Sequence, residues 1–179
     1  MVLVKHAHAS SIRRIYKSDR LRPGSYAGSR LSANFAKDLA RGAVGEQIFH
    51  NLMPHLQKLG RTADFVCPYT GQTFEVKVDY TSHPNFFFES MSDVAKGKIG
   101  GPWRSAQEKT TWFVYLFAKT GQGYITSTRQ LVREIEKLQK KEKLRVVSVQ
   151  NRSWITRGVL VPKDKLAGVG KTFTFEAIA

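Results

Sequence analysis

Apolar side chains recur at steps of three and four residues between positions 34 and 59, a period that predicts a long helix with one apolar face. Asn34 is suited to cap the start of this helix and Gly60 to end it. Pro54 falls inside the pattern and lacks the backbone N–H that a helix interior needs. We therefore expect a kink or a break just before it.

Three short strands come after this helix in the pattern. Residues 62–67 and 73–79 favour extended structure, and the second segment alternates between apolar and polar side chains. The intervening Pro68–Gly71 stretch is rich in turn-forming residues, which predicts a hairpin. Residues 85–89, with three consecutive phenylalanines, are interpreted as a third strand.

The second half of the chain adds further strands and one more helix. The continuous apolar run 111–117 is typical of a central strand covered on both faces. A helix is predicted over 128–142, followed by strands over 145–149 and 158–161. Glycines in residues 90–110 indicate a mobile loop. The order predicts an α/β fold, a mixed central β-sheet flanked by helices.

The first 35 residues have a different character. Apolar periodicity is poor and turn-forming residues are frequent, which predicts an irregular basic arm with one short helix near residues 10–18. The folded domain is then expected to span residues 36–179, with a basic helix and strands at its C-terminal end.

The net charge of the chain restricts the candidate functions more than any other feature of its composition. The chain has 29 Lys and Arg against 14 Asp and Glu, a formal net charge of +15. The flanks, residues 1–45 and 130–179, carry +7 and +6, whereas the middle block, 46–129, carries only +2. Such an excess favours a polyanionic partner, nucleic acid first and an anionic membrane surface second. A soluble protein that is merely basic is the alternative.

Several classes of protein are disfavoured by the composition. Cys67 is the only cysteine, so neither an intramolecular disulfide nor a multi-cysteine zinc site is available. No apolar run is long enough to span a bilayer, and the N-terminus lacks the apolar segment of a signal peptide. We therefore expect a cytoplasmic, intracellular protein without a membrane partner.

Candidate chemistry gathers on the predicted hairpin. Glu75 and Lys77 point to the same face of their strand because strand side chains alternate. The turn would bring Asp64 of the preceding strand near Glu75. Two carboxylates suit a hard cation such as Mg²⁺, and an adjacent lysine suits phosphodiester hydrolysis by orienting water or stabilising charge. The alternative is an exposed strand face on which Glu75, Lys77 and Asp79 form salt bridges.

Glu46 is a further candidate. It borders the apolar face of the first predicted helix, where a glutamate is unusual unless it has a partner. A metal shared with the sheet, or Lys77, would provide that partner.

The pattern formed by Glu46 on a helix, Asp64 at a strand end and the triplet Glu75-Val76-Lys77 resembles that of the PD-(D/E)xK nuclease superfamily. This superfamily includes many restriction enzymes, some junction resolvases and some homing endonucleases. The resemblance covers about residues 36–142 and implies a restriction-endonuclease-like core, in the order helix–three strands–helix–strand. It implies that Asp64 and Glu75 are metal ligands and that Glu46 supports the metal site. Lys77 would activate or position the attacking water. Ala63 stands where the family's proline would be.

Possible nucleic-acid contacts lie outside this group. An exposed tryptophan beside an arginine, Trp103-Arg104, is a reasonable substrate contact. Basic residues of the arm are candidates for the DNA backbone, with a solvated tail as the alternative: Arg13, Arg14, Lys17, Arg20 and Arg22.

Together these features predict a DNA endonuclease dependent on Mg²⁺ or Mn²⁺, either site-specific as in homing endonucleases or specific for branched DNA. By analogy we expect a homodimer or larger homo-oligomer, because one site cuts one strand. The rival predictions are a non-catalytic nucleic-acid-binding protein and an inactive nuclease fold used as a scaffold. Whether Asp79 or Glu89 joins the site is left open by the sequence.

Overall fold

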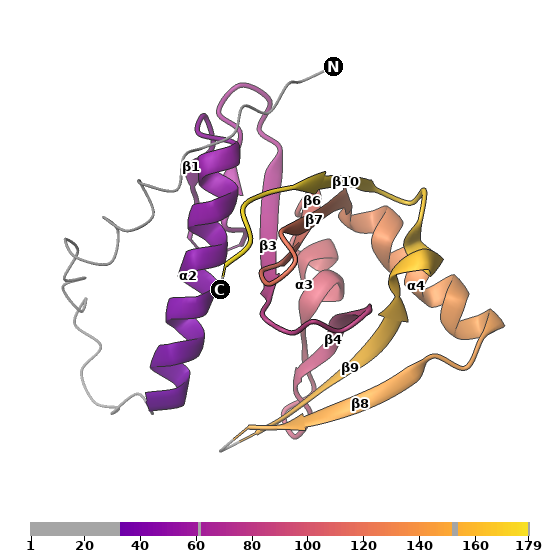
Figure 1. The fold of residues 1–179 in the computed structure, drawn as a ribbon. Coiled ribbons are helices and arrows are strands. Elements are labelled where there is room, and N and C mark those ends of the chain that lie inside the picture. The colour runs from indigo at the N-terminus through magenta and orange to yellow at the C-terminus, as the bar shows by residue number, and fades with distance from the viewer. Residues whose placement is uncertain (1–32, 61, 152–153, 179) are drawn as a thin grey trace. The chain divides into compact units, whose positions relative to one another are not determined.

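The computed structural model describes residues 33–60, 62–151 and 154–178, with side chains from residue 40 onward (Figure 1). The chain divides into two compact units, residues 1–54 and 55–179. The first unit contributes one described helix, α2 (Ala33–Leu52). The predicted helix near residues 10–18 lies outside the described residues.

The second unit contains a six-stranded mixed sheet in the order β1-β2-β3-β6-β7-β10. Neighbouring strands are antiparallel except for β3 and β6, which run parallel. A parallel pair needs a crossover connection, and residues 80–111 provide it. The strands are β1 (Gln57–Lys58), β2 (Phe65–Val66), β3 (Thr73–Asp79), β6 (Trp112–Phe117), β7 (Gln122–Ser127) and β10 (Lys171–Thr174).

A second sheet is antiparallel throughout, in the order β5-β4-β9-β8. Two helices and a short 3-10 helix complete the unit (Figure 1). The strands of the second sheet are β4 (Asn85–Asp93), β5 (Lys98–Ile99), β8 (Arg145–Gln150) and β9 (Ile155–Pro162), and the helices are α3 (Gly101–Gln107), α4 (Thr128–Lys141) and η1 (Lys163–Leu166).

The main core of the second unit combines β4 and β9 of the smaller sheet with β6 and β7 of the larger one. Aromatic rings dominate it: Phe86 packs edge-on against Tyr115, with 5.1 Å between ring centroids. Leu131 and Ile135 of α4 belong to the same cluster and are fully buried. Burial of such large rings is the chief stabilising contribution that this part of the fold provides.

The alternating sequence of β3 places its charged side chains beside this core. In the parallel register Glu75 lies next to Phe113 and Lys77 next to Tyr115 of β6. Laterally paired residues share a face of the sheet, so the charged row of β3 lies on the face where the aromatic row of β6 packs. Phe74 belongs to the opposite face.

Several expectations are confirmed at this level. The run 111–117 forms β6, flanked by β3 and β7, and residues 113–117 are all buried. The helix predicted over 128–142 is α4. The protein therefore has an α/β architecture with a mixed sheet and helices.

The helix predicted by the apolar period over residues 34–59 is interrupted just before Pro54, which confirms the break expected there. Helix α2 ends at Leu52, and residues 57–58 form β1 instead. Pro54 cannot donate a helical hydrogen bond, and its ring disfavours helical backbone before it. Leu56 and Leu59, which continue the apolar period in the sequence, therefore lie beyond the helix end.

The prediction of a mobile loop over residues 90–110 is wrong. β4 continues to Asp93, and β5 and α3 occupy much of the segment between β4 and β6. The Gly100-Gly101-Pro102 sequence is typical of a turn, yet a proline at the start of a helix is favourable because its missing N–H would have no helical partner. Strand β4 pairs with β9 in the smaller sheet rather than beside β3, and β7 and β10 were not predicted.

Candidate active site

The β2–β3 hairpin forms as the sequence predicts. Gly71 has a φ of 67° and donates its N–H to the carbonyl of Cys67 at 2.8 Å, which closes the turn. Phe65 pairs with Phe74, so the residue before it, Asp64, comes opposite Glu75. The hairpin thus brings the two candidate carboxylates together.

Asp64 is fixed to β3 by both backbone and side chain. Its N–H donates to the carbonyl of Phe74 at 2.9 Å, and its carboxylate Oδ2 accepts from the N–H of Val76 at 2.7 Å. A hydrogen bond to a charged acceptor of this length is strong and orients the carboxylate. Asp64 therefore lies in a defined position next to Glu75.

The surroundings of Glu75 disfavour the ionised form of its carboxyl group. Burial first, and then the negative charge of Asp64, raise its pKa to about 7. Arg104 opposes this shift, donating from Nη2 to Glu75 Oε1 at 2.6 Å. Glu108 adds a smaller contribution that raises the pKa. Two neighbouring carboxylates disfavour simultaneous ionisation, and a divalent cation would remove that penalty.

Lys77 has a partner on the smaller sheet. Its Nζ lies 3.6 Å from Oε1 of Glu89, a residue of β4. The Lys77 side chain is 42% exposed and that of Glu89 27%, so the pair remains accessible to water. Glu89, left open by the sequence, therefore joins the candidate site.

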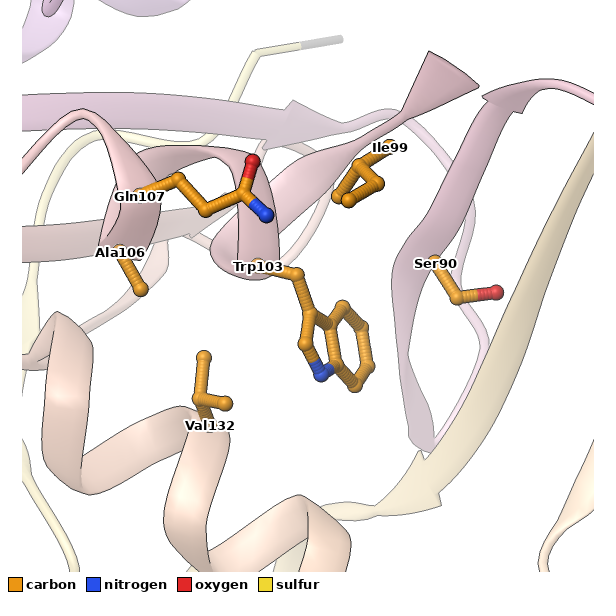
Figure 2. Close-up of a pocket in the computed structure, with 6 residues that line it drawn as sticks. All are labelled: Ser90, Ile99, Trp103, Ala106, Gln107 and Val132. Atoms are coloured by element: carbon orange, nitrogen blue, oxygen red, sulfur yellow. The ribbon is translucent and has the colours of Figure 1, made fainter. Parts of the chain in front are cut away.

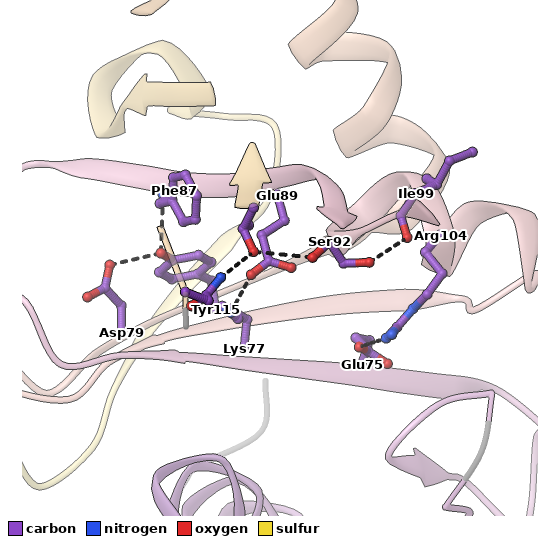
Figure 3. Close-up of polar contacts among 11 residues, drawn as sticks. Glu75, Lys77, Asp79, Phe87, Glu89, Ser92, Ile99, Arg104 and Tyr115 are labelled. Atoms are coloured by element: carbon purple, nitrogen blue, oxygen red, sulfur yellow. Dashed lines mark hydrogen bonds and ion pairs between the residues drawn. The ribbon is translucent and has the colours of Figure 1, made fainter. Parts of the chain in front are cut away.

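The two ion pairs, Glu75–Arg104 and Lys77–Glu89, line one cavity of about 200 Å³ (Figure 3). Acids and bases are paired between elements, since Glu75 and Lys77 belong to β3, Arg104 to α3 and Glu89 to β4. The remaining lining comes mostly from aromatic residues and the start of α3: Phe87, Phe88, Phe113, Gly101 and Pro102. Four charged side chains thus converge on one small space whose lining is mostly polar.

The start of α3 lies unusually close to β4, and this positions Arg104. Gly101 has a φ of 46°, and a Cβ there would come within 2.6 Å of the Glu89 carbonyl oxygen. A side chain at this position would have to displace backbone. Glycine thus allows the close approach by which Arg104 and Glu89 reach the same cavity.

Asp79, the other acid left open, has a structural role at the far end of β3. Its Oδ2 accepts from the Tyr115 hydroxyl at 2.9 Å, and its Oδ1 accepts from Thr81 N–H at 2.6 Å. The same hydroxyl accepts from the N–H of Phe87 at 3.2 Å. Burial raises the Tyr115 pKa well above its usual range, so the phenol stays neutral. Asp79 thus anchors the aromatic core to β4.

Trp103 lies on the other side of α3, where it lines a shallow pocket with residues of β4, β5 and α4 (Figure 2). Its ring packs partly against the core, and its Nε1 donates to Oε1 of Glu136 at 3.3 Å. The ring edge is thereby held between α3 and α4. A contact between Trp103 and nucleic acid stays a prediction.

The remaining predicted site residues belong to the first unit. Glu46 lies on α2, in the first unit, and its role at the metal stays a prediction. The basic residues of the arm fall outside the described residues: Arg13, Arg14, Lys17, Arg20 and Arg22.

The residues at the hairpin fit a hard divalent cation. Asp64 and Glu75 supply two neighbouring carboxylates, and Mg²⁺ commonly takes one or two of these, with water and phosphate completing its coordination. Within residues 33–60, 62–151 and 154–178, no group of three or more His, Cys, Asp or Glu is arranged to hold a metal. Burial is the main cause of the raised pKa of Glu75, and the neighbouring charge of Asp64, which a cation would offset, is the second.

Sequence reasoning missed how the charges pair. The contact of Arg104 with Glu75 and that of Glu89 with Lys77 are not predicted, and the DNA contact expected for Arg104 stays a prediction. A weak signal was present: the Gly100-Gly101-Pro102 start of a helix, shortly after a strand carrying Glu89, indicates a close return of the chain.

Comparisons with known proteins assign no family. No family model, no curated protein and no solved structure matches this chain. In the described part of the chain, no helix has the length and apolar character needed to cross a membrane. The function must therefore be inferred from the cavity and from the charge of the chain.

Proposed function

We propose that this protein is a DNA endonuclease dependent on Mg²⁺, or Mn²⁺ in its place, of the PD-(D/E)xK type. One observation carries the proposal. Asp64 directly precedes β2 and comes opposite Glu75 of β3, close enough for its charge to raise the Glu75 pKa, and Lys77 lies on the same strand face as Glu75. This is the arrangement that the resemblance implies for a metal ligand pair and its lysine.

In this proposal Asp64 and Glu75 hold the metal through their carboxylate oxygens. When bound, the metal would neutralise charge on the scissile phosphate and acidify a water molecule. Asp64 is pre-oriented by its hydrogen bond from Val76 N–H, so it needs little rearrangement to bind. Glu75 must be ionised to bind, which becomes more favourable above its pKa of about 7.

Lys77 directs its ammonium into the same cavity. Glu89, 3.6 Å away, restrains that ammonium without burying it. From there Lys77 can orient a water molecule or donate to a phosphate oxygen as negative charge develops. Glu89 acts in this scheme as a positioning residue.

The order of elements supports a restriction-endonuclease-like core, although through other segments than expected. If β4 and β5 are set aside, a helix, three strands, a helix and a strand occur as α2, β1 to β3, α3 and β6. The predicted third strand, β4, is instead part of the crossover between β3 and β6. The family's proline is absent at Ala63, a position that performs no chemistry.

DNA is the substrate that the charge favours. A net charge of +15 on 179 residues supports binding to a phosphate backbone, with a strong dependence on salt. The substrate is then either a specific duplex sequence or a branched structure. Cutting both strands calls for two sites, so we propose a homodimer or larger homo-oligomer.

A second candidate is a non-catalytic nucleic-acid-binding protein, and one observation favours it. Glu75 and Lys77 already have ion-pair partners, Arg104 and Glu89, so the cluster can be stable without a metal. In that case the charges would serve structure alone. The two candidates differ in whether the cavity binds a divalent cation.

The test is to incubate the protein with supercoiled plasmid and with a synthetic four-way junction, each with Mg²⁺, Mn²⁺ or EDTA. Glu75→Gln keeps the shape of the side chain but removes its charge. Glu142→Gln is the matched control, because Glu142 lies at the end of α4 and pairs with Lys165 at 2.8 Å. We expect metal-dependent cutting by the wild type and by Glu142→Gln, and none by Glu75→Gln.

The preferred substrate would distinguish a duplex endonuclease from a junction resolvase. Tight, salt-sensitive binding without cutting, together with no calorimetric uptake of Mg²⁺ or Mn²⁺, would favour the non-catalytic protein. Lys77→Ala adds a further check: it should bind DNA as the wild type does but fail to cut. Loss of binding together with cutting would contradict a role in the chemical step.

A further inference from the structure

Arg104 occupies the side of Glu75 that faces the cavity. Its Nη2 lies 2.6 Å from Glu75 Oε1, and both residues line the space that also contains Lys77 and Glu89. Figure 3 shows the guanidinium of Arg104 reaching Glu75 from α3. One of the two carboxylate oxygens of Glu75, a candidate metal ligand, is therefore engaged by a cation of the protein itself.

The local charge explains why a cation is held there. Glu75 has the carboxylates of Asp64 and Glu108 near it, and Arg104 is the neighbouring group that favours its ionised form. The Glu75 side chain is only 16% exposed, so water does little to screen this charge. Arg104 thus acts as the counter-ion of the carboxylate pair.

The guanidinium is only partly satisfied in this position. Its Nε is buried and has no hydrogen-bond partner within the described part of the chain, although it forms an ion pair with Oε2 of Glu108 at 3.7 Å. A buried N–H without a partner is costly. The Arg104 side chain as a whole is 41% exposed, which leaves a path toward solvent.

A divalent cation and the guanidinium would compete for Glu75. Both seek the same carboxylate, and two positive groups at that short range repel each other. Arginine released from Glu75 would still be anchored on α3 at the same cavity. Its planar fork of donors matches the oxygens of a phosphate.

We propose that Arg104 is an exchangeable counter-ion, which holds Glu75 while no metal is bound, is displaced by a divalent cation, and then binds a phosphate of the nucleic acid. The proposal rests on the proposed function, because it requires the Asp64–Glu75 pair to bind metal. It also couples the two ligands: by linkage, metal should strengthen DNA binding, and DNA should strengthen metal binding by the same factor.

The test is calorimetric titration of Mg²⁺ and of Mn²⁺ into the full chain without nucleic acid, at about pH 8.5, where Glu75 is ionised. Four proteins are compared: wild type, Arg104→Gln, Arg104→Lys and Arg145→Gln. Arg145 is an exposed arginine of β8 outside the cavity lining and serves as the charge-matched control. Circular dichroism and melting curves check that each variant folds.

Removing the competitor should tighten metal binding. We expect Arg104→Gln to bind Mg²⁺ about fivefold more tightly than the wild type, with Arg104→Lys between them and Arg145→Gln unchanged. Equal or weaker binding by a folded Arg104→Gln would overturn the exchange but leave the proposed function standing. If neither wild type nor Arg104→Gln binds metal, the proposed function fails with it.

DNA binding provides the second readout. With Ca²⁺, a hard cation with the same preference for oxygen, the affinity of the wild type for a duplex should rise relative to EDTA. In Arg104→Gln that rise should be about fivefold smaller, because the phosphate contact is missing. An equal rise in both proteins would show that Arg104 does not transfer to phosphate, which contradicts the exchange.

Discussion

Strands β3 and β6 lie side by side in one sheet and present opposite chemistry on the same face. In the parallel register Glu75 and Lys77 of β3 lie next to Phe113 and Tyr115 of β6. The rings of Phe113 and Tyr115 are at most 2% exposed and pack against the smaller sheet. The β3 side chains are only partly buried and reach across to Arg104 and Glu89.

The difference shows how a fold can hold charges at the edge of its core. A buried ring is stabilised by its area alone, whereas a carboxylate next to that core needs a partner for its charge. The partners come from α3 and β4, both in the crossover that makes β3 and β6 parallel. The segment that completes the sheet therefore also supplies the charged wall of the cavity.

The largest expected effect falls on the charged row. Asp64→Asn keeps an oxygen that can accept from Val76 N–H but removes the charge that a metal ligand needs. We expect the protein to remain folded and cleavage to fall by about a hundredfold or more. A cleavage assay beside a melting curve checks this, and a fully active variant would remove Asp64 from the site.

A substitution in the aromatic core beside the charged row should lower the stability of the fold instead. Phe88 is 1% exposed and packs against Phe113 and Tyr115. Phe88→Ala should lower the free energy of unfolding by about 3–5 kcal/mol, measured by urea denaturation. A change below about 1 kcal/mol, on the order of an exposed substitution, would show that the two rows do not differ in this way.

The pH dependence of stability separates the rows further. Folding raises the Glu75 pKa from 4.5 to about 7, so the folded protein binds the proton more tightly and loses stability as pH rises through that window. Burial makes the largest contribution to this shift, the negative charges of Asp64 and Glu108 add to it, and Arg104 opposes it. Glu75→Gln should therefore be about 1–3 kcal/mol more stable than the wild type at about pH 8.

That difference should shrink toward zero near pH ~4, where Glu75 is largely protonated in both the folded and the unfolded wild type. Urea denaturation from about pH 4 to about pH 8 measures it, with Glu142→Gln as the exposed control. A stability difference that stays constant across the whole pH range would mean that folding does not raise the pKa of Glu75.

The smallest effect concerns the link between the two rows. The Tyr115 hydroxyl donates to Asp79 and accepts from Phe87 N–H. Tyr115→Phe keeps the ring but leaves both partners unsatisfied, which should cost about 1–2 kcal/mol of stability without loss of cleavage. Loss of cleavage with stability intact would instead place Asp79 in the site.

Much of this comparison was predictable from the sequence. The alternation in β3, the continuous apolar run of β6 and the turn after β2 are local signals, and they suffice to bring Asp64 to Glu75. Each depends on a short stretch of chain whose period fixes its faces.

The partners of the charges were not predictable in the same way. Glu89 meets Lys77 only because β4 lies in the second sheet, and no local pattern specifies that register. Arg104 reaches Glu75 because α3 forms where glycines suggested a loop and because Gly101 lets it approach β4. Both contacts are set by tertiary packing rather than by local preference.

The most direct test of the metal site is anomalous diffraction from crystals of the wild type soaked with Mn²⁺ and of Glu75→Gln treated identically. We predict a peak between the carboxylates of Asp64 and Glu75 in the wild type and no peak in the variant. A wild-type crystal with saturating Mn²⁺ and no peak at this position would contradict the account.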